Sequence, residues 1–206
     1  YANLPQAAHI LLNAGYQFRS VSQDGTILND VPPRYQWDEN GGYCGEESLS
    51  SAAAAYGTYI DQYNMRALIG TQNKDQLLLG KNDRIAAEKL RLNATTWEGT
   101  GKSTDDFLIW VKQNVSQGHP VAIGVYINES IFGEKGDREY DHIITITGVK
   151  AQNPSVTDYN GKDLLYYSDN GFYGDDTANT QYAYRVSFHK FQGSRRQANQ
   201  KKAPIY

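Results

Sequence analysis

The sequence predicts an α+β fold in which a mainly helical N-terminal part precedes an antiparallel sheet. Apolar residues recur at helical spacing in several segments before residue 118. After residue 119, short runs rich in β-branched and aromatic residues take their place, as is typical of strands. Asn160-Gly161, between two of these runs, is typical of a hairpin turn and therefore of antiparallel pairing. We expect a cleft where the helical part and the sheet meet.

The chain of 206 residues is long enough for one domain with a substantial core. We interpret residues 1–206 as a single domain, with residues 1–118 as its mainly helical half and residues 119–192 as its β half. Residues 193–206, which contain two pairs of basic residues, are expected to form a loosely held tail.

The helical half begins with an expected short helix over residues 4–15 and a loop over residues 31–43 that is dense in Pro, Gly, Asn and Asp. A helix is then expected to start at Cys44 and to stop at Gly57. Its apolar positions follow helical spacing, and its first turn is acidic. The apolar positions are Leu49, Ala52, Ala53 and Tyr56, and the acidic residues of the first turn are Glu46 and Glu47.

Two more helices are expected before the sheet. The pattern over residues 82–92 indicates a helix with Asn82 or Asp83 as its cap. Residues 104–115 form an amphipathic pattern with a strongly apolar side. Four strands are then expected, over residues 120–127, 142–149, 163–169 and 182–191.

Composition excludes several classes of function. A net charge of −3 provides no basic surface for nucleic acid and no polybasic membrane anchor. The longest apolar runs are too short to span a bilayer. Neither a phosphate-binding loop, a zinc-ligand spacing nor a dinucleotide fingerprint is present, so we expect no metal and no cofactor.

Other features favour a secreted protein. The chain starts at Tyr1, which indicates a processed mature form or a trimmed one, and it holds 16 tyrosines but a single cysteine. Three Asn-x-Ser/Thr sequons, at Asn93, Asn114 and Asn128, agree with an extracellular glycoprotein.

The single cysteine, Cys44, lies between a Gly-rich loop and a helix start. A helix N-terminus stabilises a thiolate through its dipole and its free backbone N–H groups. A thiol nucleophile in that position also needs a base, which is usually a histidine distant in sequence. Because a lone cysteine is more often a small buried apolar residue, the assignment depends on such a partner.

Of the four histidines, His142 is the best candidate for the base. It opens the strand over residues 142–149, and strand alternation places it on one face with Ile144 and Ile146. His9, His119 and His189 lack a comparable setting.

The next strand offers a group that could orient the imidazole. Asp169 and Asn170 stand where the strand over residues 163–169 meets a loop. Because they are adjacent and point to opposite faces, only one of them can serve.

Three sequence blocks resemble the signature blocks of the papain superfamily of cysteine peptidases. They are "GGYCGEESL" before an Ala-rich helix, "YDHIITITGV", and "LLYYSDNG". The segment "VPPRYQWDENGGYCG" is similar to the opening of the bacteriocin-leader peptidase-like branch, and the phytochelatin synthase branch has a similar helix start. The resemblance covers residues 31–57 and 140–172 and implies a papain-like fold, with the helix at Cys44 packed on the sheet beside an active-site cleft.

The resemblance also implies roles for individual residues. Cys44 would be the nucleophile, His142 the general base and acid, and Asp169 the orienting group, with Asn170 as the alternative. Gln36 would donate its side-chain amide to the oxyanion, together with the backbone N–H of Cys44.

The sequence departs from the papain pattern near the cysteine. Gln36 lies eight residues before Cys44, a longer spacing than in papain, and Asn40 is a rival oxyanion donor. Gly45 replaces the tryptophan that follows papain's cysteine. Negative charge from Glu46 and Glu47 would disfavour a thiolate, and we expect both side chains to point to solvent, where screening limits the effect.

The sequence therefore predicts a thiol-dependent hydrolase that cleaves amide bonds of a peptide or protein substrate through a thioester. Two alternatives remain open: a non-catalytic secreted binding module on the same fold, and an acyl or peptidyl transferase.

Overall fold

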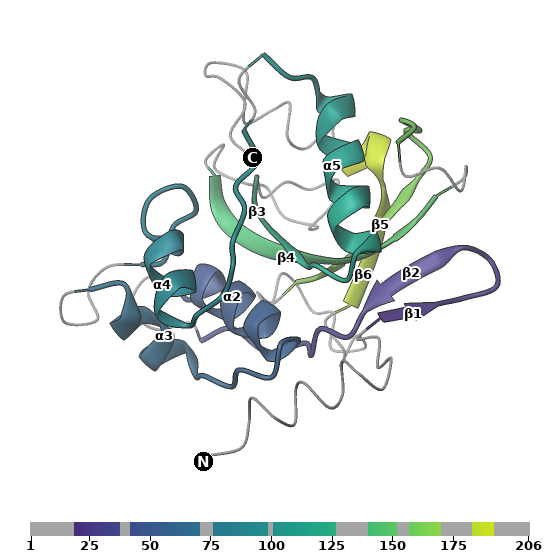
Figure 1. Ribbon diagram of the computed structural model, residues 1–206. Helices are drawn as coiled ribbons and strands as arrows, with labels where there is room; N and C mark the ends of the chain where they lie inside the picture. The colour runs from purple at the N-terminus through teal and green to yellow at the C-terminus, as the bar shows by residue number, and fades with distance from the viewer. Residues whose placement is uncertain are drawn as a thin grey trace.

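The computed structural model describes residues 19–37, 42–70, 76–98, 101–126, 140–151, 157–169 and 183–191. These ranges contain β1 (Arg19–Val21), β2 (Thr26–Asn29), α2 (Cys44–Ala54), α3 (Gln62–Leu68), α4 (Asp83–Lys89), α5 (Thr104–Ser116), β3 (Val121–Tyr126), β4 (Tyr140–Lys150), β5 (Leu164–Ser168) and β6 (Ala183–Ser187). The α+β class is confirmed (Figure 1). No helix in the described ranges is long and apolar enough to cross a membrane. The helix expected over residues 4–15 and the tail over residues 193–206 lie outside these ranges.

All strand pairs in the sheet are antiparallel, and β4 is its central member. The strand order is β1-β2-β4-β5-β6, and β3 also pairs with β4. Strands β2 and β3 pair with different stretches of β4, at residues 148–150 and 140–146 respectively, while β5 pairs with residues 145–150. Figure 1 shows α5 lying across this sheet, with α2, α3 and α4 gathered in a separate group.

The β1–β2 hairpin was not expected, so the order of helices first and sheet second is wrong at this point. Its strands have only three and four residues, too few to produce a recognisable alternation. Gly25, with φ of +80°, and Asp24, whose carboxylate accepts from the Thr26 N–H at 3.1 Å, form the turn. The hairpin joins the sheet because β2 pairs with β4.

The run over residues 182–191 is shorter as a strand than expected. Strand β6 ends at Ser187, and the chain continues as a helical turn that buries Phe188 and Phe191. The turn at Asn160-Gly161 also differs from the expected two-residue hairpin. The Asp163 N–H donates to the Asn160 carbonyl at 3.0 Å, inside a longer connection, and neither Asn160 nor Gly161 has the positive φ of a type I′ turn.

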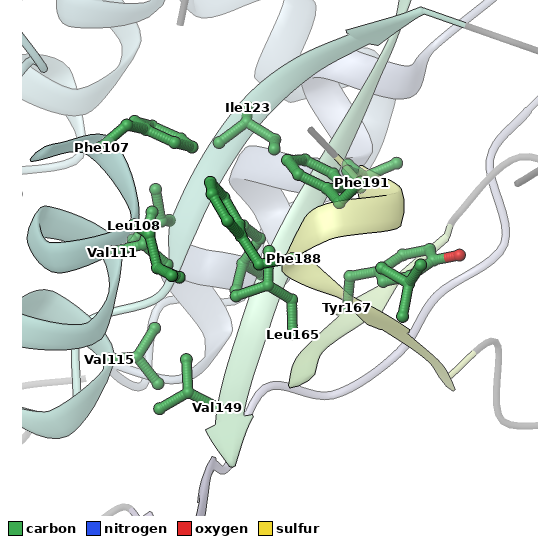
Figure 2. Close-up of a cluster of buried hydrophobic side chains, with 14 of the residues drawn as sticks. Phe107, Leu108, Val111, Val115, Ile123, Val149, Leu165, Tyr167, Phe188 and Phe191 are labelled. Atoms are coloured by element: carbon green, nitrogen blue, oxygen red, sulfur yellow. The ribbon is translucent and has the colours of Figure 1, made fainter. Parts of the chain in front are cut away.

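The main core lies between α5 and the sheet. Phe107, Leu108, Val111 and Val115 form the buried side of α5, and Figure 2 shows them facing side chains from the strands and from the last helical turn. Those partners include Ile123, Val149, Leu165, Tyr167, Phe188 and Phe191. Each fully buried aliphatic or aromatic side chain contributes about 1.5–3 kcal/mol. This core fixes β3, β4 and β5 relative to one another.

Helix α2 is buried on nearly all sides rather than along one apolar stripe. Its small residues let it approach β4 closely: the Ser48 hydroxyl donates to the Ile143 carbonyl at 3.0 Å, and the Thr145 hydroxyl donates to the Ser48 carbonyl at 3.2 Å. The expected stop is present, since Gly57 has φ of +81° and its N–H donates to the Ala54 carbonyl. Tyr56, expected on the apolar stripe, is exposed.

Helices α4 and α5 begin differently. Asn82 occupies the cap position of α4, but its side chain does not cap the helix; it accepts from the Leu78 N–H instead. Helix α5 begins with a capping box formed by Ser103 and Asp106.

A buried ion pair connects α5 to the beginning of β5. The Lys112 ammonium group lies 2.8 Å from the Asp163 carboxylate and donates to the Asp158 carbonyl at 2.7 Å. Lys112 and Asp163 are both fully buried.

We predict that Lys112→Met lowers the free energy of unfolding by about 3–5 kcal/mol, because it leaves the Asp163 carboxylate buried without its cation. Urea denaturation measures the change. The exposed Lys81→Met is the control and should change stability by less than about 0.5 kcal/mol. A loss below about 1 kcal/mol in Lys112→Met would contradict the importance of this pair.

Candidate active site

Cys44 is the first residue of α2 and is partly exposed. The residue before the helix is Tyr43, and its side chain makes no hydrogen bond to the backbone N–H groups of the first turn. The positive end of the helix dipole therefore lies next to the sulfur.

Gly45 follows Cys44 because no larger residue fits. A Cβ atom at this position would lie 2.1 Å from the Leu77 carbonyl oxygen and 3.1 Å from Cδ1 of Ile143. The helix start is thus wedged between a backbone segment and β4, which accounts for the glycine where papain has tryptophan.

The structure brings His142 and Asp169 together beside this helix start. Nε2 of His142 lies 2.9 Å from Oδ1 of Asp169, and both residues are buried, with 1% and 4% of their surface exposed. Cys44 also acts on this imidazole, because its neighbouring thiol raises the pKa of His142. Cys44 comes from α2, His142 from β4, and Asp169 from the position directly after β5.

Opposing effects act on the His142 imidazole. Burial lowers its pKa, but the hydrogen bonds to Asp169 and Cys44 and the charges of those two groups raise it, and the outcome is a pKa of about 9. The imidazole is therefore protonated at neutral pH and is able to donate to both of its neighbours.

A bulge in β4 determines which residue meets His142. Lys150 pairs with Leu164 and Gly148 with Tyr166; continued without a break, this register would put Asn170 opposite Ile144. The register instead shifts by one residue between Ile146 and Gly148, so that Thr145 pairs with Ser168.

Asp169 consequently comes level with Ile144 and diagonal to His142 on the same face. A one-residue shift exchanges the two faces of a strand, so without the bulge Asp169 would point away from the imidazole. Asn170, the alternative orienter, lies outside the described residues.

Gln36 lies close to the residues that precede the cysteine. Its Nε2 atom is 3.5 Å from the position that a Cβ on Gly42 would take, two residues before Cys44. Its buried Oε1 atom finds no hydrogen-bond partner among the described residues. Asn40, the rival donor, lies outside the described residues.

The expectation that Glu46 and Glu47 point to solvent is wrong, because both are buried. Glu46 is neutralised by Arg66, whose Nε lies 2.6 Å from its carboxylate, and it accepts from the Leu77 N–H at 3.0 Å. For Glu47, burial raises the pKa to about 7, against the opposing effects of its Ser51 hydrogen bond and the Arg34 charge. Pairing and partial protonation, rather than solvent screening, limit the negative charge beside Cys44.

The described histidines other than His142 lie elsewhere. His119 hydrogen-bonds the Tyr56 hydroxyl at 3.0 Å, beyond the opposite end of α2, and His189 is exposed in the turn after β6. His9 lies outside the described residues. Two residues of α3, Gln62 and Arg66, contact the residues around Gln36 and Cys44 and were not predicted, because nothing in the local sequence pattern distinguishes them.

Comparison with known proteins identifies the family. The model of the Peptidase_C39 like family matches residues 28–202, and the chain therefore belongs to this family. The resemblance to a branch of the papain-like cysteine peptidases is confirmed.

A solved structure has the same fold. It is the peptidase domain of Streptococcus ComA, a bi-functional ABC transporter involved in a quorum sensing pathway. That domain is 20% identical to this chain, with a TM-score of 0.50, and the match covers 80% of this chain and 91% of the domain. No curated protein matches the chain by sequence.

We predict that the His142 imidazole titrates near pH 9 and that Asp169→Asn lowers its midpoint by about 1–3 pH units, because the variant removes a hydrogen-bonded negative charge. NMR titration of the His142 ring measures both values. A His142 midpoint that is unchanged in Asp169→Asn would mean that the two side chains do not interact in solution.

Proposed function

We propose that this protein is a thiol-dependent hydrolase of peptide bonds, with Cys44 as nucleophile. The observation that carries the proposal is the buried His142–Asp169 pair, 2.9 Å apart, beside Cys44 at the start of α2. Membership of the Peptidase_C39 like family supports the same reaction class.

In the proposed acylation step, the Cys44 thiolate attacks the carbonyl carbon of the scissile peptide bond. The imidazolium of His142 then gives its proton to the leaving amine, and the amine departs while the acyl group stays on sulfur as a thioester. Asp169 stabilises the charged imidazole and fixes its orientation, because Nε2 of the ring is engaged with the carboxylate.

Deacylation reverses these roles. Neutral His142 takes a proton from water, the resulting hydroxide equivalent attacks the thioester carbon, and the carboxylic acid product leaves as the thiolate–imidazolium pair is restored.

Both steps pass through an oxyanion that needs hydrogen-bond donors. In the proposal, the backbone N–H of Cys44 and the side-chain amide of Gln36 are these donors. The position of Gln36 beside Gly42 supports this role, since its Nε2 lies against the residues that lead into the helix start. One such donor contributes about 3–4 kcal/mol to stabilisation of the transition state.

The other expectations from the sequence stay predictions: extracellular location, glycosylation at Asn93, Asn114 and Asn128, and the absence of nucleic-acid and membrane partners. They do not affect the chemistry proposed for the site.

The proposal is tested with denatured casein as substrate in water enriched in oxygen-18. We predict new peptides whose C-terminal carboxylates carry the heavy isotope, detected by mass spectrometry, and none with Cys44→Ala. Gln36→Ala should lower kcat by about 10²–10³-fold, because it removes one oxyanion donor. Products that gain an added amine instead of heavy oxygen would identify an acyl transferase.

Alkylation by iodoacetamide at pH 6 separates an active site from an idle one. An ordinary thiol is only about 0.3% ionised at this pH. We predict fast alkylation of Cys44 that slows about tenfold or more in His142→Ala, whereas Gln36→Ala leaves the rate unchanged, since this reaction forms no oxyanion. If alkylation is slow and has the same rate in His142→Ala, and if casein is not cleaved, the non-catalytic binding module is the function that remains.

A further inference from the structure

Helix α3 contacts both segments that would supply the oxyanion donors. Its first residue, Gln62, and the residue one turn later, Arg66, are separated by four positions and therefore lie on the same side of the helix. Both are buried, with 5% and 1% of their surface exposed. Polar residues so deeply buried in a short helix are held by specific hydrogen bonds.

Gln62 binds the backbone on both sides of Gln36. Its Nε2 donates to the Tyr35 carbonyl at 2.7 Å, and its Oε1 accepts from the Trp37 N–H at 2.9 Å. The two bonds reproduce the pairing that a neighbouring strand would provide. They fix the direction in which the intervening side chain, that of Gln36, leaves the backbone.

The segment around Gln36 has one more tie to the same part of the chain. Arg34 donates from Nη1 to the Ile60 carbonyl at 2.9 Å, just before α3 begins. The loop that carries Gln36 is thus attached to the start of α3 at more than one point.

Arg66 binds the residues on both sides of Cys44. Its guanidinium donates to the Gly42 carbonyl, lies 3.6 Å from the centre of the Tyr43 ring, and pairs with the Glu46 carboxylate at 2.6 Å. One planar cation therefore links the loop before the nucleophile to the first turn of α2. This fixes the direction of the Cys44 N–H.

We propose that α3 is a positioning brace for the oxyanion site, in which Gln62 aligns the side chain of Gln36 and Arg66 aligns the backbone N–H of Cys44. The proposal rests on the proposed function. In this proposal neither residue contacts the substrate. Each residue acts through one of the two oxyanion donors. Helix α3 thereby sets the distance between the Gln36 amide and the Cys44 N–H, and both donors stabilise one oxyanion only when this distance is correct.

The Gln62 contact is tested first, with Gln62→Met. Methionine has a similar length but makes neither hydrogen bond. The two bonds are only partly buried, so their loss leaves no fully buried backbone group without a partner. Tyr63→Ala, on the exposed side of α3, is the matched control.

Hydrogen exchange tests the contact without reference to activity. The Trp37 amide should exchange at least about tenfold faster in Gln62→Met than in the wild type. The Met65 amide, which donates to the Asp61 carbonyl within α3, should be unchanged. Unchanged exchange at Trp37 would overturn the brace, whatever the activity of the protein.

Acylation kinetics test the catalytic role. With an N-acetyl peptide p-nitrophenyl ester as probe, Gln62→Met should lower the acylation rate by about 10- to 100-fold, as expected for a misplaced catalytic group, and Tyr63→Ala should not. Iodoacetamide alkylation of Cys44 should stay within about twofold. In a Gln36→Ala background, the further effect of Gln62→Met should shrink to less than about twofold, because the group through which it acts is gone.

The Arg66 contact needs a paired change, because Arg66 alone cannot be removed without leaving Glu46 charged and buried. Glu46→Gln combined with Arg66→Met should lower acylation about tenfold, and this loss should persist in the Gln36→Ala background, since it acts through the other donor. A folded double variant with wild-type acylation would overturn this part of the proposal.

The remaining outcomes separate the two proposals. Gln62→Met could lower the acylation rate by the same factor in the wild type and in the Gln36→Ala background, or it could lower the rate of iodoacetamide alkylation as much as the rate of acylation. Either result would overturn the brace while the hydrolase assignment stands. The proposed function, and the brace with it, would be overturned if the ester does not acylate the wild-type protein and if Cys44 is alkylated at the same rate in the wild type and in His142→Ala.

Discussion

The register of β4 on β5 is the constraint on which the candidate site depends. His142 lies in β4 and Asp169 directly follows β5, and only a side chain on the same face as the imidazole is able to reach it. The one-residue bulge between Ile146 and Gly148 brings the carboxylate to that face. A hydrogen bond of 2.9 Å between two buried groups is the result, and it is the reason that the imidazole keeps its proton despite burial.

The second requirement is that α2 reaches the same point. Its position is fixed by small residues: Gly45 leaves room for the Leu77 carbonyl, and Ser48 binds the β4 backbone. The two glutamates of the first turn contribute in another way. Glu46 connects α2 to α3 through Arg66, and Glu47 is held inside the protein with a raised pKa. The helix start is consequently attached to its surroundings on several sides, as a site that must hold an atom in place requires.

Local patterns were sufficient to select Cys44, His142 and Asp169 as candidates, because a helix start, a strand opening and a strand end each have a signature within a few residues. They were also sufficient for the α+β class and for the positions of α5, β3 and β5. Local patterns could not distinguish between Asp169 and Asn170, because this choice depends on a β-bulge that no residue type in the sequence predicts.

The burial of Glu46 and Glu47 was mispredicted for a related reason. A glutamate in the first turn of a helix usually faces solvent. The partners of Glu46 are Arg66 and Leu77, which are 20 and 31 residues away in the chain. Gln62 was missed because its partners are backbone groups, which leave no trace in composition. The β1–β2 hairpin was missed because its strands are too short to show a period.

That hairpin has a consequence for the extent of the working unit. At Gly148, beside the bulge, an added Cβ would lie 2.6 Å from the Ile27 carbonyl oxygen, so the β2 backbone occupies the space where a side chain would otherwise stand. The family match begins at residue 28, inside β2, but the support of the bulge begins with β1 at Arg19. A protein trimmed to the limits of sequence similarity would retain every residue of the proposed chemistry and would lose part of the scaffold that sets their alignment.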